Sequence, residues 1–148
     1  MTIRVYLEKN VTPALIEEAV PLIRQMHVET QGAPLRGLNT NFLRDAVMSN
    51  LIRVIVARDG ATLVGFMLMY TFESILGEKH ATITDVYVDK PHRGKALNVA
   101  DQMMALATAM ADAGGAKCSA IARKEHAINM FLRNGFVATG VSLERAHG

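Results

Sequence analysis

Cysteine and tryptophan are the residues that this sequence most clearly lacks. The 148-residue chain has one cysteine, Cys118, and no tryptophan, and aromatic residues make up only 5% of it. A single thiol excludes an intramolecular disulfide and any metal site built from several cysteines, which favours a reducing, cytoplasmic setting. We interpret Cys118 itself as a buried structural thiol, and the alternative is a reactive nucleophile.

Charge of one sign and long apolar runs are also missing. The formal net charge is only +2, whereas nucleic-acid binding usually requires a concentrated basic surface with stacking aromatic residues. The longest apolar run, Ala61 to Phe72, falls well short of the roughly 20 residues that a membrane helix needs. The N-terminal stretch alternates and carries charge, unlike a signal peptide. We therefore expect no nucleic-acid partner, no membrane span and no export signal.

The histidine spacing gives no metal motif. The five histidines never fall at i and i+4 or in a His-Glu-x-x-His pattern, so we expect no metal site. His92 flanks a basic turn that is described below, and simple exposure would explain it.

The composition that remains is typical of one ordinary folded domain, and we expect a single α/β (α+β) domain over residues 1–148. Hydrophobic residues make up 50% of the chain, and a chain of this length buries a full core without disulfides. Periodicity, caps and turn residues predict the order β-αα-βββ-α-β-α-β. The expected elements are a strand Ile3 to Leu7, helices from Thr12 to near Val28 and Asn41 to Asn50, strands Leu51 to Arg58, Thr62 to Ser74 and His80 to Val88, a helix Leu97 to Ala113, a strand Cys118 to Ala122, a helix Glu125 to Asn134 and a strand Phe136 to Leu143.

Alternation assigns faces to the residues of the strand His80 to Val88. Side chains at every second position share a face, which predicts one face with Ile83, Asp85 and Tyr87 and the other with Thr84, Val86 and Val88. An aspartate inside an apolar strand is out of place. This singles out Asp85 as a candidate functional residue.

Three features together resemble the GNAT acetyltransferase superfamily. The segment Asp85 to Gly94 is similar to a family strand that ends in Val-x-Pro-x-x-Arg-Gly, and Ala127 to Phe136 is similar to the family's last helix and its Gly-Phe exit. The element order is the third feature. The resemblance covers nearly the whole chain. It implies a mixed central sheet whose central strands splay apart to form a cleft for CoA, with a bulge in the strand before the loop. It also implies transfer of an acetyl group from acetyl-CoA to an amine.

The turn after the strand stands where the family holds the CoA pyrophosphate. A helix N-terminus presents unpaired N–H groups and a partial positive charge. The family pattern Arg/Gln-x-x-Gly-x-Gly/Ala is kept at Arg93, whereas Ala96 stands where glycine is usual and Asn98 where glycine or alanine is usual. A basic loop that only caps a helix is the alternative. The residues of this expected phosphate loop are Arg93, Gly94, Lys95, Ala96, Leu97 and Asn98.

The resemblance also assigns residues along the rest of the cleft. Main-chain groups of Val86, Tyr87 and Val88 are expected to pair with the pantetheine arm, and the Val88 amide to donate to the thioester carbonyl, where negative charge develops during attack. Lys124 replaces a usual asparagine, and either reaches a CoA phosphate or is a surface lysine. The residues expected beside CoA from this last part of the chain are Lys124, Asn129 and Phe131.

Amine acylation requires a proton acceptor, because only the neutral amine attacks. Asp85 is the best candidate base by position, and the alternative is that its carboxylate is paired structurally. Glu73 is the second candidate base, and the alternative is that it is a solvated residue at the end of a strand. Where family members often carry a tyrosine that protonates the leaving thiolate, this chain has Phe131. Tyr87 or Tyr70 is the candidate substitute, unless each is only a core residue.

We therefore interpret the chain as an acetyl-CoA-dependent N-acetyltransferase that uses acetyl-CoA as co-substrate in a ternary complex, without a metal. The acceptor is expected beside the loop Glu29 to Thr40 and the end of the strand Thr62 to Ser74. Glu29, Arg36 and Glu73 there either tune acceptor choice or are solvated charges. The alternative is a GNAT-like acyl-CoA-binding or protein-interaction module with reduced catalysis. A homodimer is left open.

Overall fold

Five strands form one mixed sheet at the centre of the molecule. A computed structural model describes residues 2–32, 37, 39–94, 97–122, 124–140 and 143–146, and in this part of the chain the strand order is β1-β2-β3-β4-β5. The first four strands pair antiparallel with their neighbours, and β5 runs parallel to β4. The predicted mixed sheet is confirmed. The strands are β1 Ile3–Glu8, β2 Ile52–Asp59, β3 Thr62–Glu73, β4 Lys79–Val88 and β5 Lys117–Ala120.

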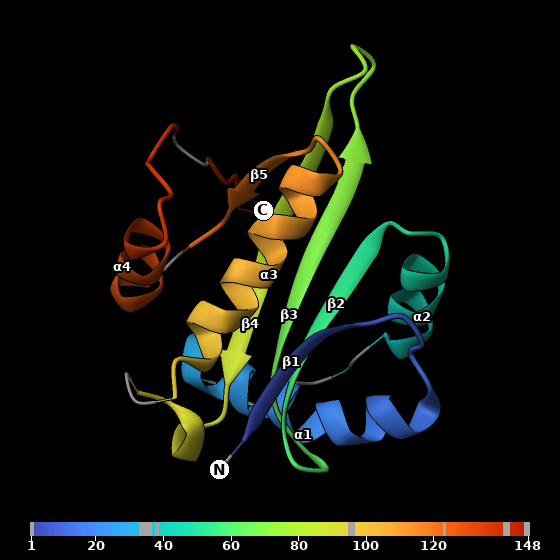
Figure 1. The fold of residues 1–148 in the computed structure, drawn as a ribbon, viewed down its shortest axis with the longest axis vertical. Coiled ribbons are helices and arrows are strands. Elements are labelled where there is room, and N and C mark those ends of the chain that lie inside the picture. Colours follow the sequence, from blue (N-terminus) through green and yellow to red (C-terminus); the bar gives the residue numbers. More distant parts are fainter. Residues whose placement is uncertain are drawn as a thin grey trace.

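Helices cover both faces of this sheet (Figure 1). One core cluster joins α1 and α2 to β2 through Val54 and Val56, and another joins α3 to β2 through Ile55 and Ala57. Because consecutive strand residues point to opposite faces, the apolar run from Val54 to Ala57 in β2 contributes to both clusters. We call these faces the α1–α2 face and the α3 face. The helices are α1 Pro13–Gln31, α2 Thr40–Met48, the 3-10 turn η1 Lys90–His92, α3 Val99–Ala113 and α4 Glu125–Arg133.

The ends of α1 follow from its capping residues. Thr12 accepts a hydrogen bond from the Leu15 amide at 3.2 Å, and Pro13 occupies the first helical position, where its missing N–H costs nothing. Gly32 closes the helix with a left-handed φ of 70° and donates to the Val28 carbonyl. The helix therefore runs three residues beyond the predicted end near Val28, up to the glycine that can adopt this conformation.

One predicted set of faces is wrong because β4 contains a bulge. Met69 pairs with Ile83 and Leu68 pairs with Asp85, so Thr84 is an extra residue on β4. An extra residue reverses the alternation beyond it. Ile83 therefore faces α3, as Val88 does, whereas Asp85 lies opposite Leu68 on the α1–α2 face.

The last predicted strand is also not formed. Residues 136–140 and 143, the described part of the expected strand Phe136 to Leu143, adopt no strand conformation. The Phe136 amide donates to the Phe131 carbonyl at 3.0 Å, and the two rings pack edge to face at 5.3 Å. These contacts fold the chain back on α4 as it leaves that helix, so its alternating apolar residues are not aligned along β5.

Candidate active site

The pairing between β4 and the edge strand β5 stops partway along β4. β5 pairs with β4 only from His80 to Ile83, and the Ile121 amide still donates to the Ile83 carbonyl at 3.1 Å. The bulge at Thr84 follows directly, and a bulge bends a strand and increases its twist. In the described part of the chain, the edge of β4 from Thr84 to Val88 therefore has no β5 partner. β5 ends at Ala120, so its pairing with β4 stops there, and the splay of the central strands that the resemblance implied stays a prediction.

Two of the three residues expected on this open edge direct their backbone groups into it. The Asp89 amide donates to the Val64 carbonyl of β3 at 2.9 Å. Backbone groups of successive strand residues alternate between the two neighbouring strands, so Tyr87 also turns its groups toward β3. Val86 and Val88 turn theirs to the open edge, where the Val88 carbonyl accepts from Arg93 Nε at 2.7 Å.

The expected phosphate loop leads from η1 into the N-terminus of α3. Arg93, Gly94, Leu97 and Asn98 lie in the described part of the chain, and Lys95 and Ala96 lie outside it, as does Arg36. Asn98 immediately precedes α3 with a left-handed φ of 50° and makes no side-chain capping bond. The first amides of α3 therefore receive no capping bond from Asn98 and are available to an anion.

Arg93 is already engaged by protein groups. Besides its bond to Val88, its guanidinium donates to both carboxylate oxygens of Glu29 at 2.8 and 3.1 Å and lies 5.2 Å from the centre of the Tyr87 ring. The bond from Arg93 lowers the pKa of Glu29. Arg93 thus ties the phosphate loop to the last turns of α1, and a direct contact with phosphate stays a prediction.

Tyr87 lies in the core on the α1–α2 face. Its side chain packs against Phe66, and its hydroxyl is buried without a regular hydrogen bond to the described residues. Burial, and then the neighbouring Glu29 carboxylate, raise the pKa of Tyr87 to about 12. A hydroxyl with this pKa is poorly matched to proton donation near neutral pH.

The two candidate bases are far apart. Asp85 is partly buried at the bulge, where Thr84 donates to its carboxylate at 2.8 Å, and no ion pair to it is found among the described residues. Glu73 is exposed at the end of β3, opposite Lys79. Leu68 of β3 is the partner of Asp85, and Glu73 lies five positions further along β3. At the usual rise of a strand, this corresponds to about 16 Å. Only Asp85 lies near the point where the pairing of β4 with β5 stops.

The residues expected from the last helix divide between core and surface. Phe131 is buried in the core cluster of the α3 face, where Leu97 also packs. Lys124 and Asn129 are exposed. A connection that sequence patterns did not predict joins α4 to α3: Asp101 accepts from Arg133 at 2.9 Å and from Asn134 at 3.0 Å.

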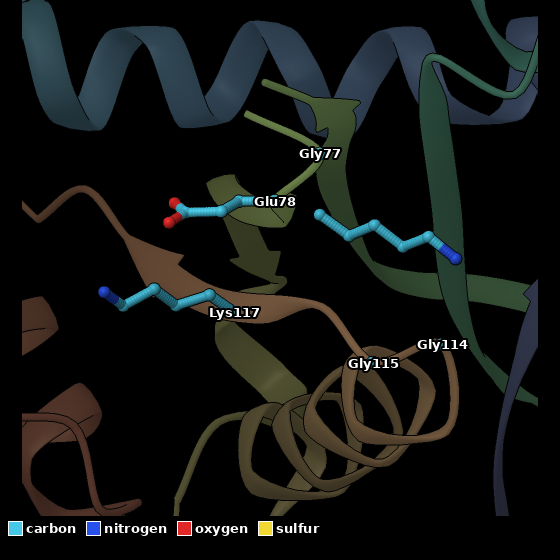
Figure 2. A pocket seen from close by; sticks show the side chains of 6 residues that line it. Gly77, Glu78, Gly114, Gly115 and Lys117 are labelled. Atoms are coloured by element: carbon cyan, nitrogen blue, oxygen red, sulfur yellow. The ribbon is translucent and has the colours of Figure 1, made fainter. Parts of the chain in front are cut away.

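Two surface hollows lie at the opposite end of β4. One, of about 450 Å³, lies between the β3–β4 connection and the end of α3, and Figure 2 shows its lining residues, with Glu78 and Lys117 among them. The other, of about 590 Å³, lies beside it on the α3 face and includes Met69 and Met110. Of the expected CoA-site residues that the structure describes, none lines either hollow.

The described residues contain neither a metal-binding cluster nor a membrane-spanning helix. In the described ranges, no group of three or more histidine, cysteine, aspartate or glutamate side chains is arranged to hold a metal ion. None of the helices that the structure describes is both long and apolar enough to cross a membrane.

Comparison with known proteins identifies the family. The family model described as the acetyltransferase (GNAT) family matches residues 20–136. The chain belongs to this family. Comparison with curated protein sequences gives no match.

Solved structures of GNAT acetyltransferases share this fold. An aminoglycoside acetyltransferase, meta-AAC0020, from an uncultured soil metagenomic sample is similar with a TM-score of 0.78 at 15% identity, over 99% of this chain and 95% of that one. A ribosomal-protein-alanine N-acetyltransferase from Brucella melitensis biovar Abortus 2308 gives 0.76 at 16% identity, over 99% and 100%. A predicted acetyltransferase with acetyl-CoA from Clostridium acetobutylicum gives 0.76 at 14%, over 98% and 96%.

Proposed function

We propose that this GNAT-family chain transfers an acetyl group from acetyl-CoA to a primary amine, by direct attack in a ternary complex. The observation that carries the proposal is the open edge of β4 beyond Ile83, which begins at a bulge and ends beside the N-terminus of α3. An unpaired strand edge next to unpaired helix amides suits a long ligand with amide groups at one end and phosphates at the other.

The chain's own groups fit acetyl-CoA along this path. Val86 and Val88 supply backbone groups for the amides of the pantetheine arm. The Val88 amide donates to the thioester oxygen, which gains negative charge during attack. The loop from Gly94 to Asn98 and the first turn of α3 hold the pyrophosphate.

Asp85 acts as the base. An ammonium group gives its proton to Asp85, directly or through one water, and the neutral nitrogen attacks the carbonyl carbon of the thioester. The new C–N bond forms, the C–S bond breaks, and CoA leaves as a thiolate; the nitrogen releases its second proton to solvent to give the amide, and the thiolate takes a proton from solvent. A thiol with an ordinary pKa near about 8.5 is a tolerable leaving group without an enzymic acid, which is consistent with Phe131 and with the buried position of Tyr87.

The acceptor enters on the α1–α2 face, beside the end of α1. Asp85 faces that side. The printed names of two structural neighbours give two classes of amine to test first: an aminoglycoside and the N-terminal alanine of a protein. The lone, half-buried Cys118 supports a reducing, cytoplasmic setting for this reaction.

The test combines binding and turnover. Calorimetric titration with acetyl-CoA should give a measurable Kd, and thiol release should identify an active amine. With that amine, Asp85→Asn should lower kcat about 100-fold or more, the usual range for loss of a general base, and leave the Kd for acetyl-CoA unchanged because the backbone edge of β4 is intact. If Glu73→Gln abolishes turnover and Asp85→Asn does not, the base is wrongly assigned.

The second candidate is an acyl-CoA-binding module with reduced catalysis. Phe131 favours it, because the phenyl ring is buried in the core and donates no proton. The two candidates differ in one outcome: the module binds acetyl-CoA with the predicted dependence on the β4 edge but releases no CoA with any amine.

A further inference from the structure

His92 bridges two aspartates from different parts of the chain. Its Nδ1 lies 2.5 Å from Oδ1 of Asp89, which follows β4, and its Nε2 lies 3.0 Å from Oδ2 of Asp59, the last residue of β2. Only 14% of the His92 side chain is exposed. Simple exposure, the sequence-based explanation, is therefore wrong.

The bridge requires a protonated ring. Ionised carboxylates only accept hydrogen bonds, so both ring nitrogens must donate, as they do in the imidazolium form. The bond to Asp59, and then the bond to Asp89, raise the pKa of His92. Those two carboxylates are the charges that face the ring from β2 and from the end of β4. The cations of the same turn, Lys90 and Arg93, direct their charge to Glu29 of α1.

The position of His92 connects this bridge to the cofactor loop. The His92 amide donates to the Asp89 carbonyl at 3.1 Å, and the Arg93 amide to the Lys90 carbonyl at 3.2 Å. This single turn joins the open edge of β4 to Gly94. Arg93 attaches the loop to α1 on one side, and His92 attaches it to the β2–β3 turn on the other.

We propose that His92 is a positioning residue for acetyl-CoA: its imidazolium, bonded to Asp59 and Asp89, holds the loop between β4 and α3 where its amides receive the pyrophosphate. This proposal rests on the proposed function. A neutral ring donates from only one nitrogen, so deprotonation breaks one bond. It also changes the charge of the group from one negative to two, next to an anion site. Affinity for acetyl-CoA therefore falls as the pH rises through the raised pKa of His92.

The experiment compares wild type, His92→Gln and Asp59→Asn, with His80→Gln as the matched control. His80 also lies near a carboxylate, with Nε2 3.5 Å from Glu78, but at the far end of β4. Calorimetry measures the Kd for acetyl-CoA across about pH 6 to 9, the range in which a histidine with a raised pKa titrates. NMR follows the titration of His92, and hydrogen exchange without ligand follows the amides of Arg93, Gly94 and Leu97.

For His92→Gln, the proposal predicts that acetyl-CoA binds about tenfold more weakly at neutral pH, the effect of losing a bond to a charged group. The Kd of this variant should also lack the increase with pH that is expected for wild type. Asp59→Asn, which keeps an acceptor, should lower the pKa of His92 and move the pH profile with it. His80→Gln should change neither. Equal exchange rates and an equal Kd in wild type and His92→Gln would overturn the proposal. If wild type binds no acetyl-CoA, the proposed function fails, and the exchange rates still decide whether His92 holds the loop.

Discussion

Replacing Gly65 by alanine should force β4 away from β3 at the open edge of β4. Gly65 pairs with Val88, and a Cβ added to it would lie 2.8 Å from the Tyr87 carbonyl oxygen. That is about 0.5 Å closer than the roughly 3.3 Å of close carbon–oxygen contacts. Because the obstructing atom belongs to the backbone of β4, no side-chain rotation relieves the contact, and the strand itself must move.

The magnitude follows from two opposing effects. Overpacking of this kind costs about 1–3 kcal/mol, and replacing glycine by alanine returns about 0.4–1 kcal/mol by restricting the unfolded chain. The net loss of about 1–2 kcal/mol lowers the Tm by about 3–6 °C for a domain of this size. Since Tyr87 lies between Val86 and Val88, the displacement should also weaken acetyl-CoA binding several-fold.

Thermal unfolding and calorimetry measure both effects, with Gly114→Ala as the control. Gly114 ends α3 with a φ of −83°, and a Cβ there would lie 3.5 Å from its nearest neighbour, the Met110 carbonyl. Alanine fits at that position without strain. A Tm for Gly65→Ala equal to that of wild type, or an equal loss in Gly114→Ala, would refute the reasoning.

Two further predictions concern single ionisable groups. Glu29→Gln removes the partner of Arg93; because that bond lowers the pKa of Glu29, its stabilisation is present above the ordinary value of 4.5 and is lost as the pH falls through the lowered pKa. Because this pair is partly exposed, the variant should lose about 1 kcal/mol or less of unfolding free energy at neutral pH. Unfolding of wild type and variant at neutral and acidic pH measures this difference. A difference that is equal at both pH values would contradict the prediction. Burial raises the pKa of the Cys118 thiol, so it should react slowly with a thiol reagent in the native protein and rapidly in denaturant; a native rate equal to that of free cysteine would contradict this.

Local patterns predicted most of the fold. Thr12 begins α1 as predicted because a cap acts within a turn, and Asp59-Gly60 marks the β2–β3 hairpin because a tight turn needs such residues. The end of α1 at Gln31 was predicted too early, near Val28. The mixed sheet and the presence of a bulge in the strand before the loop followed from the family resemblance, but the position of the bulge and its effect on the faces did not. The bulge at Thr84 leaves no signal in the apolar alternation. It depends on how β3 and β4 pair over their whole length, and it decided which face Asp85 occupies.

The contacts around the expected phosphate loop could not be predicted from the sequence, because they join residues that are far apart in the chain. Arg93 and Glu29 are 64 positions apart, and His92 and Asp59 are 33 apart. Charged residues at such separations meet only after the sheet has formed, and spacing rules cover neighbours within a few residues. The role of Arg93 at a phosphate stays a prediction, and the sequence did not predict that Arg93 bonds to Glu29 and His92 to Asp59 on the two sides of the loop.

Asn98 bears directly on the choice between an enzyme and a catalytically reduced module. It departs from the small residue usual in the family, yet it adopts a φ of 50°, a conformation that asparagine tolerates better than most side chains. Its amide donates to the Gly94 carbonyl at 3.2 Å, and its carbonyl accepts from the Gln102 amide at 2.9 Å. These two bonds connect the loop to the first turn of α3 through the backbone of Asn98, without its side chain. The departure at Asn98 is therefore a weak argument against acetyl-CoA binding, and among the described residues the alternative module depends on Lys124 and Phe131.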